Sequence, residues 1–176
     1  MTYFATMPSP IGELTLCSNG KALTGLYFST GSKARSADPA WRRDDACLAP
    51  AVAQLEEYFA GQRSAFDLVL APPTTEFQHK VLNALLDIPY GQMRSYKDIA
   101  YAIGNPKAVR AVGTANGNNP IAIIIPCHRV VGSNGALTGF GGGLPAKRWL
   151  LDLESQHAQF TLSNYKVTFL ESRTFG

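Results

Sequence analysis

Two adjacent prolines divide this chain into halves of different character. Residues 71–75 read Ala-Pro-Pro-Thr-Thr, and proline interrupts regular structure because its ring fixes one backbone angle and removes the amide hydrogen. Strand-like alternation precedes this segment, whereas helical spacing follows it. A length of 176 residues allows one large domain or two small ones. We expect an N-terminal domain over 1–73, a second domain over 74–155 and an extension over 156–176.

The first half predicts a small mixed α/β domain. Strand-like alternation covers 14–17, 22–28 and 66–70. Asn19-Gly20 is typical of the tight turn of a β-hairpin. Apolar residues at helical spacing from Leu48 predict a helix that ends at Gly61. Residues 29–46 are polar and follow neither period, so we interpret them as a surface loop.

The second half predicts short helices over 76–87, 95–103 and 106–116, followed by a strand over 121–125 and a last helix from about Pro145. Thr74 or Thr75 caps the first helix, and Ser95 with Asp98 forms a capping box for the second. The turn at Gly104 between the second and third helices is short enough for a helix-turn-helix. In the extension, 165–170 is strand-like.

The helix over 106–116 has two unlike faces. Its apolar stripe consists of Val109, Val112 and Ala115, and its other face carries Lys107, Arg110, Gly113 and Thr114. Glycine within a helix costs about 1 kcal/mol relative to alanine, so a compensating role is expected. A face of small residues allows close approach to a DNA duplex, although an ordinary solvated face fits the composition equally well.

Cys127 is the candidate nucleophile. On spacing alone, a single cysteine after the apolar run 121–125 is more typical of a buried structural thiol. Pro126 ends that run, however, and the basic residues His128 and Arg129 follow at once. Cationic or basic neighbours lower the pKa of a thiol and favour the thiolate, which is the reactive form.

His128 can serve Cys127 only under a geometric condition. Neighbouring residues in a strand point to opposite faces, so the chain has to turn at Pro126 or a water has to bridge the two side chains. A carboxylate would then orient the imidazole. Glu154 near the end of the last helix is the nearest candidate in the sequence, although taken alone it fits a solvated helix position better.

Composition and motifs exclude several other functions. With 45% hydrophobic and 16% charged residues, the chain buries a core instead of staying disordered. A net charge of +3 excludes a histone-like polycation but not a compact nucleic-acid binder. The glycine-rich run 139–143 lacks the Lys-Ser/Thr of a P-loop, so we interpret it as a flexible flap. Histidines and cysteines lack zinc-site spacing, so no metal is expected.

The expected location is the cytoplasm. The N-terminus lacks the basic and apolar regions of a secretory signal, and the longest apolar run, 121–126, is too short to cross a bilayer. Three cysteines, Cys17, Cys47 and Cys127, are too few and odd in number for a disulfide framework. We expect no membrane partner.

The run Ile-Pro-Cys-His-Arg-Val-Val at 125–131 closely resembles the active-site signature of the O6-alkylguanine-DNA alkyltransferases. Further matches fall at Ser95-Tyr96, 104–113, Asn119-Pro120, 142–144 and 147–154, so that about 76–154 is covered. The first half resembles the family's smaller domain only in size and strand pattern. The resemblance implies an α+β fold: a ribonuclease H-like roll followed by a mainly helical, winged-helix-like domain with a helix-turn-helix.

The resemblance also implies a DNA repair protein that acts once. It would rotate O6-alkylguanine, or alternatively O4-alkylthymine, out of duplex DNA from the minor groove and transfer the alkyl group to Cys127 without a cofactor. His128 and Glu154 match a relay that deprotonates the thiol through a water. Asn119 matches the residue that orders the active-site turn. Tyr96 matches the tyrosine that helps to rotate the phosphate and donates a proton toward the leaving guanine.

The remaining matches concern DNA and the rotated base. Arg110 matches the side chain that fills the vacated stack, and the implied DNA contacts also include Lys107, Thr114, Ser95 and Tyr96. The implied base pocket consists of Val130, Phe140, Gly141 and Ala122. Phe140 stands where many members have tyrosine and Gly141 where some have serine. Members act on double-stranded DNA with alkylated bases; we expect a monomer, and cooperative binding stays open.

Two other functions are alternatives to this one. A winged-helix DNA-binding regulator without transfer activity would retain Tyr96 and Arg110 but has no need of Cys127. A cysteine hydrolase would use Cys127 and His128 repeatedly, but no motif indicates an acyl pocket.

Overall fold

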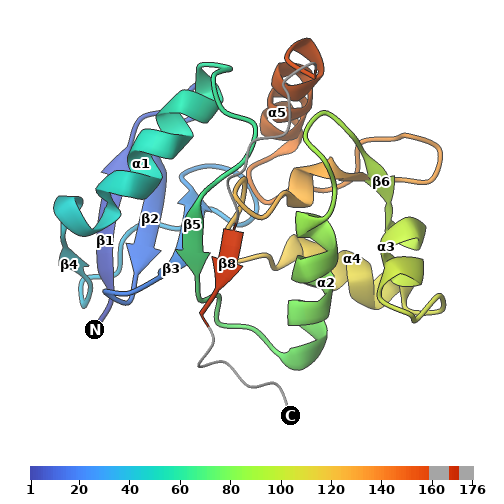
Figure 1. Cartoon of the computed structure of the whole chain (residues 1–176), viewed down its shortest axis with the longest axis horizontal. Helices are drawn as coiled ribbons and strands as arrows, with labels where there is room; N and C mark the ends of the chain where they lie inside the picture. Colours follow the sequence, from blue (N-terminus) through green and yellow to red (C-terminus); the bar gives the residue numbers. More distant parts are fainter. Residues whose placement is uncertain (159–166, 171–176) are drawn as a thin grey trace.

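The computed structural model describes residues 1–158 and 167–170. In Figure 1 a twisted sheet with α1 (Asp45–Phe59) on one face stands beside a group of short helices. The strand order is β4 (Arg42–Arg43), β1 (Tyr3–Met7), β2 (Leu14–Ser18), β3 (Leu23–Phe28), β5 (Leu68–Leu70) and β8 (Val167–Phe169). Strands β1, β2 and β3 pair antiparallel, whereas β5 pairs parallel to β3 and β8 parallel to β5.

The central strand β2 is buried along its whole length. Helix α1 contacts β1 and β2, and its first turn is capped by the side chain of Asp44, which accepts from the amide of Cys47. On the neighbouring strand, Leu26 donates its amide to the carbonyl of Pro120 in the second half of the chain. The sheet is therefore covered by α1 and also joined directly to the segment that leads to Cys127.

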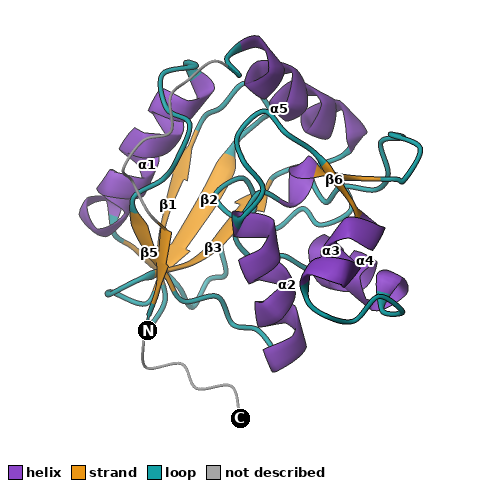
Figure 2. Ribbon diagram, turned by 45° about the vertical axis from the view of Figure 1, so that its right-hand side comes forward, coloured by secondary structure: helices purple, strands orange, loops and turns teal. Residues whose placement is uncertain are grey.

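The helical part begins with α2 (Glu76–Leu86) and α3 (Tyr96–Ala102). Thr75 and Ser95 cap these helices through capping boxes. The box of Ser95 with Asp98 is as predicted, and of the two threonines predicted for the first helix, Thr75 is the cap. The third helix, α4 (Val109–Gly117), begins three residues later than Pro106 and packs against both α2 and α3 (Figure 2). The helix-turn-helix arrangement and the predicted α+β fold class are confirmed.

Around the candidate nucleophile, the chain forms the 3-10 turn η1 (Cys127–Arg129), β7 (Val130–Val131) and α5 (Leu144–Gln156). Strand β7 pairs with β6 (Arg94–Ser95), so the start of α3 is tied to the end of η1. Helix α5 contacts η1 directly.

The predicted strand over 121–125 is wrong. Only Ile121 forms an isolated bridge, to Leu26, and the chain then turns, because the amide of Ile124 donates to the carbonyl of Ala122. Ile123 takes a positive φ of 71° while fully buried. A short apolar run indicates that a segment is buried, but it does not tell a strand from a buried turn.

Two further expectations are modified. Val109 is 37% exposed and does not belong to the buried stripe of α4, which instead contains Asn116 with Val112 and Ala115. Part of the strand expected at 165–170 is present as β8, although residues 165 and 166 lie outside the described residues.

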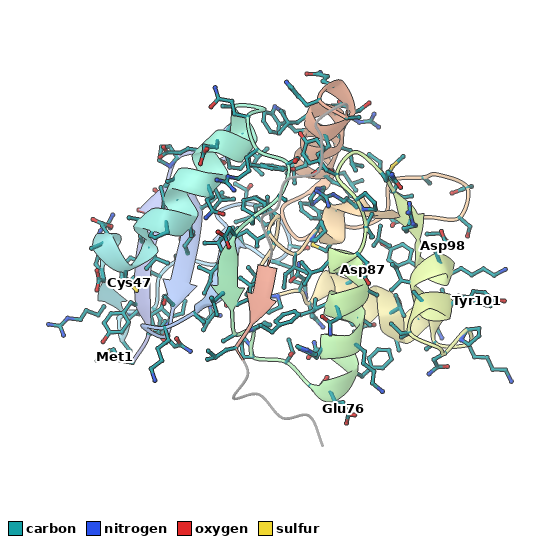
Figure 3. All side chains as sticks on the ribbon, in the orientation of Figure 1. Met1, Cys47, Glu76, Asp87, Asp98 and Tyr101 are labelled. Atoms are coloured by element: carbon teal, nitrogen blue, oxygen red, sulfur yellow. The ribbon has the colours of Figure 1, made fainter. Side chains whose placement is uncertain are left out.

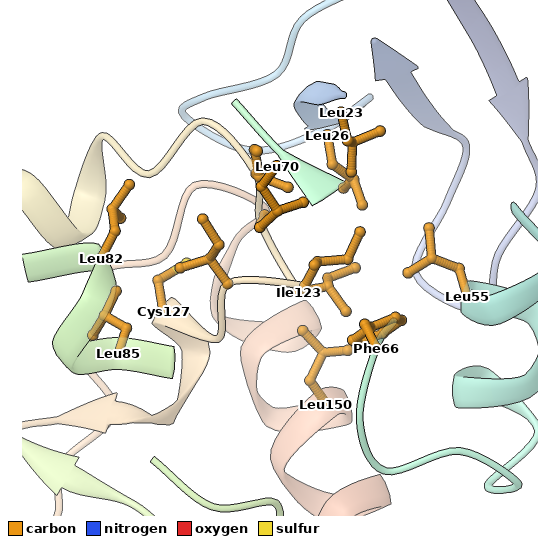
Figure 4. Packing of buried hydrophobic residues seen from close by; sticks show 14 of the residues in the cluster. Leu23, Leu26, Leu55, Phe66, Leu70, Leu82, Leu85, Ile123, Cys127 and Leu150 are labelled. Carbon is orange, nitrogen blue, oxygen red and sulfur yellow. The ribbon is translucent and has the colours of Figure 1, made fainter. Parts of the chain in front are cut away.

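One hydrophobic cluster runs from the sheet into the helices. Figure 4 shows Leu55 of α1, Leu70 of β5 and Leu150 of α5 around Ile123, with Cys127 beside Leu85 of α2. The two halves therefore share one core, to which Cys127 belongs. Within the described ranges, no helix is long and apolar enough to cross a membrane.

Candidate functional site

A sharp turn presents Cys127. It opens η1 directly after Pro126, and 5% of its surface is exposed. Asn119 holds the chain that leads to this turn, since its Nδ2 donates to the carbonyl of Ile125 at 2.8 Å and its Oδ1 accepts from the amide of Ile121 at 3.0 Å. The side chain of Asn119 thus holds both ends of the turn that leads to Cys127, in addition to the backbone hydrogen bonds within that turn.

Two opposing effects act on the pKa of the Cys127 thiol. Burial raises the pKa of the Cys127 thiol, whereas hydrogen bonding by the Asn119 side chain, the charge of Lys147 and the amides of Cys127 and His128 lower it. The net pKa is raised, so the resting group is a thiol. A base is needed to form the thiolate, and donors are already in place to stabilise it.

Glu154 connects the site to both halves of the chain. Its carboxylate is 1% exposed and receives Nε and Nη2 of Arg129 at 2.7 and 3.0 Å. Nε2 of His128 lies 2.7 Å from Oε2, and the hydroxyl of Tyr58 on α1 donates to the same oxygen at 2.6 Å. The amide of Gly91 donates to Oε1 at 3.3 Å. Every one of these partners restrains the carboxylate in one orientation.

The protonation states of Glu154 and His128 follow from their burial and from the groups bonded to them. Burial alone would raise the pKa of the Glu154 carboxyl, but the charges and hydrogen bonds of His128 and Arg129 hold it far below its usual range. Burial lowers the pKa of His128, and the attraction of Glu154 does not reverse this. Because an ionised carboxylate only accepts, Nε2 of neutral His128 carries the hydrogen, and Nδ1 is left as an acceptor.

Lys147 fixes the loop on the other side of Cys127. Its buried Nζ donates to the carbonyl of Val130 at 2.6 Å and to that of Thr138 at 3.0 Å. The hydroxyl of Tyr96 lies 2.6 Å from Oγ1 of the same Thr138. Tyr96 and Lys147 therefore restrain the 132–143 loop from two sides.

Three of the four residues predicted for the base pocket lie together. Ala122, Phe140 and Gly141 line a cavity of about 40 Å³ together with Cys127 and Asn119. Val130 does not line this cavity, although its carbonyl is bound by Lys147. A cavity of about 840 Å³ lies beside α5, but Cys127 does not line it. The small cavity is the candidate site because it contains the nucleophile.

The predicted DNA-contacting side chains lie at or near α3 and α4. Lys107, Arg110 and Thr114 are exposed, and the hydroxyl of Thr114 donates to the carbonyl of Arg110 at 3.3 Å. Ser95 uses its hydroxyl to cap α3 by accepting from the amide of Asp98. Ser95 therefore has a structural function of its own, whereas the three α4-side residues are available to a ligand.

Two family models match the chain. One, described as the ribonuclease-like domain of 6-O-methylguanine DNA methyltransferase, matches residues 2–72. The other, described as the DNA binding domain of the same proteins, matches residues 76–156. The chain belongs to the 6-O-methylguanine DNA methyltransferase family.

Individual relatives agree with this membership. A methylated-DNA–protein-cysteine methyltransferase of Methanosarcina acetivorans is 51% identical over 152 residues, which cover 86% of this chain and 97% of that protein. The crystal structure of Mycobacterium tuberculosis O6-methylguanine methyltransferase matches with a TM-score of 0.81 and 49% identity, covering 89% of this chain and 94% of that one. A structure of the M. tuberculosis protein in complex with DNA gives a TM-score of 0.82 at 50% identity, with coverages of 88% and 94%.

Sequence reasoning missed three residues of this network. Arg129 was noted only as a cationic neighbour of Cys127, and Lys147 only as part of a matching run, but both hold the site through buried hydrogen bonds. No sequence pattern indicates Tyr58, because it lies 96 positions from Glu154 and in the N-terminal half of the chain.

Tyr58→Phe tests how firmly the carboxylate is held. Burial and the charge of Glu154 raise the pKa of Tyr58 well above its usual value, so the hydroxyl stays a donor. Loss of a hydrogen bond to a charged group should lower the free energy of unfolding by about 1.5–3 kcal/mol. Urea denaturation measures this loss.

The matched control is Tyr101→Phe. Tyr101 is 60% exposed on α3 and points away from the molecule in Figure 3, so its change should stay within about 0.5 kcal/mol. Equal effects of the two substitutions would contradict a structural role for the Tyr58–Glu154 hydrogen bond.

Proposed function

We propose that this chain repairs O6-alkylguanine in duplex DNA by transferring the alkyl group to Sγ of Cys127. The observation that carries this proposal is the buried His128–Glu154 pair in the turn that presents Cys127, which supplies a neutral imidazole with an unbonded Nδ1 next in sequence to a thiol that needs a base. A protein that only binds DNA has no use for such an arrangement, which favours transfer over the regulator alternative.

The proposed reaction is one displacement. Nδ1 of His128, which has no hydrogen-bond partner among the described residues, accepts the thiol proton through a bridging water, while Glu154 stabilises the imidazolium. The sulfur of Cys127 then forms a bond to the alkyl carbon as the bond from that carbon to O6 of guanine breaks. The guanine leaves with the electron pair, and the Tyr96 hydroxyl donates a proton toward it.

The thioether product explains why one molecule would act once. A carbon–sulfur bond at Cys127 is chemically inert under cellular conditions. The alkylated sulfur carries no proton, so it cannot form a thiolate again. The relay residues His128 and Glu154 have no further step to perform. We therefore propose a single-turnover reaction without a cofactor.

DNA recognition is assigned to the exposed side of α3 and α4. Attack on O6 requires the base to leave the stack, which costs a few kcal/mol and least for a badly paired lesion. Arg110 is a long exposed cation on α4, and an inserted side chain offsets unstacking in minor-groove binders. Lys107 and Thr114 lie near it and would contact the backbone.

Mass spectrometry tests which atom accepts the alkyl group. Incubation with a duplex that contains O6-methylguanine should add one methyl group, located on the peptide with Cys127. Intact-mass measurement and peptide mapping give the result. Cys17 and Cys47 are internal controls, since burial raises the pKa of Cys17 to about 11; methylation there, or repeated turnover, would refute the mechanism.

Arg110→Ala tests the extrusion role. Transfer from duplex DNA should slow by about 10- to 100-fold, in line with the few kcal/mol that base unstacking costs, while transfer from free O6-methylguanine should be unchanged. Single-turnover rates on both substrates measure the difference, with the exposed cation substitution Arg148→Ala as control. Equal slowing on both substrates would show that Arg110 supports the pocket instead.

A further inference from the structure

The cavity at Cys127 is too small for a base as it stands. Its volume of about 40 Å³ holds only a few water molecules, since one water needs roughly 10–15 Å³ by this measure. An alkylated guanine therefore enters only after part of the lining moves. This inference rests on the proposed transfer to Cys127.

The part of the lining that closes the cavity comes from two segments distant in sequence. The amide of Lys33 donates to the carbonyl of Gly141 at 3.1 Å. Nζ of the same Lys33 donates to Oδ1 of Asn118, at the end of α4, at 2.9 Å. Phe28 and Phe140 meet edge to face, with ring centroids 5.2 Å apart. Lys33 thus joins the 139–143 loop and α4 to the N-terminal half.

Glycines let these segments approach closely. A Cβ at Gly141 would lie 2.8 Å from Cβ of Lys33, and one at Gly142 would lie 2.9 Å from the ring of Phe28. A Cβ at Gly31 would collide with the carbonyl oxygen of Gly141. The glycine-rich run, expected as a flap, is packed against Lys33 and Phe28 in the closed state.

We propose that Lys33 makes the protein selective for lesions in DNA over free alkylated bases, because its ammonium exchanges Asn118 for a backbone phosphate when the cavity opens. Lys33 lines the cavity and its side chain is exposed. A rotated nucleotide stays bonded to its two phosphates, which must then lie at the entrance. The cation next to the entrance is therefore placed to meet them.

The exchange has a direction because the two partners differ in charge. Asn118 offers a neutral amide oxygen, whereas phosphate offers a charged one, and charge-assisted hydrogen bonds are stronger. Without DNA, opening replaces the Lys33–Asn118 bond only with hydrogen bonds to water, because both groups are exposed. With DNA, the phosphate replaces it, so binding shifts the population toward the open state.

Two substitutions separate closing from phosphate binding. Asn118→Ala removes the closing contact and keeps the cation, whereas Lys33→Ala removes both. Both should raise the single-turnover rate of Cys127 methylation by free O6-methylguanine by about 2- to 10-fold, the range for one lost hydrogen bond. A substitution that merely damages the fold would slow this reaction.

Binding to duplex DNA should distinguish the two variants. Lys33→Ala should weaken binding and reduce the slope of log K against log salt by about 0.9, the value for one phosphate contact. Asn118→Ala and the control Lys21→Ala, an exposed cation in the β2–β3 turn, should leave the slope unchanged. Lys33→Arg should retain it.

The outcomes separate this inference from the proposed function. If the unsubstituted protein does not methylate Cys127, the proposed function fails. If it does, but the free-base rates of both variants are unchanged or lower, or the salt slope of Lys33→Ala equals that of the unsubstituted protein, then the assignment to Lys33 is overturned.

Discussion

The buried carboxylate of Glu154 is the constraint on which the rest of the site depends. An ionised group at 1% exposure is tolerated only when partners replace the water it has lost. Arg129, His128 and Tyr58 are those partners, and they come from η1 and α1. Satisfying one charge therefore fixes the imidazole of His128, the residue after Cys127, and ties α5 to both halves of the chain.

Burial also explains why Cys127 is unreactive in the absence of a substrate. The thiol of Cys127 is kept protonated by desolvation, and the imidazole of His128 is kept neutral by the same effect. Proton transfer from a neutral thiol to a neutral imidazole becomes favourable only as the sulfur attacks an electrophile, because the transition state of the attack is then stabilised. The donors around the sulfur, from Asn119 and from the amides of η1, are fixed by the fold before any ligand arrives.

Local sequence signals predicted much of this fold, and long-range contacts escaped them. The sequence predicts the cap at Ser95 and narrows the cap of α2 to Thr74 or Thr75, because a cap is decided by the next few positions; the structure has Thr75. The predicted strand over 121–125 is wrong, because the shape of this segment depends on the side chain of Asn119 and on positive φ at Ile123. The contact of Tyr58 with Glu154 depends on how α1 meets α5, which no local pattern encodes. For the site, the motif around Cys127 indicated the chemistry, while the closed cavity required the structure.

His128 stands neutral at the centre of this site, with its hydrogen on Nε2 directed at Glu154 and its Nδ1 unbonded among the described residues. Nitrogen-15 NMR of the imidazole at pH 7 measures this directly, because the two ring nitrogens shift differently when protonated. We expect a protonated Nε2 and an unprotonated Nδ1. A doubly protonated ring, or a hydrogen on Nδ1 with Nε2 bare, would contradict it.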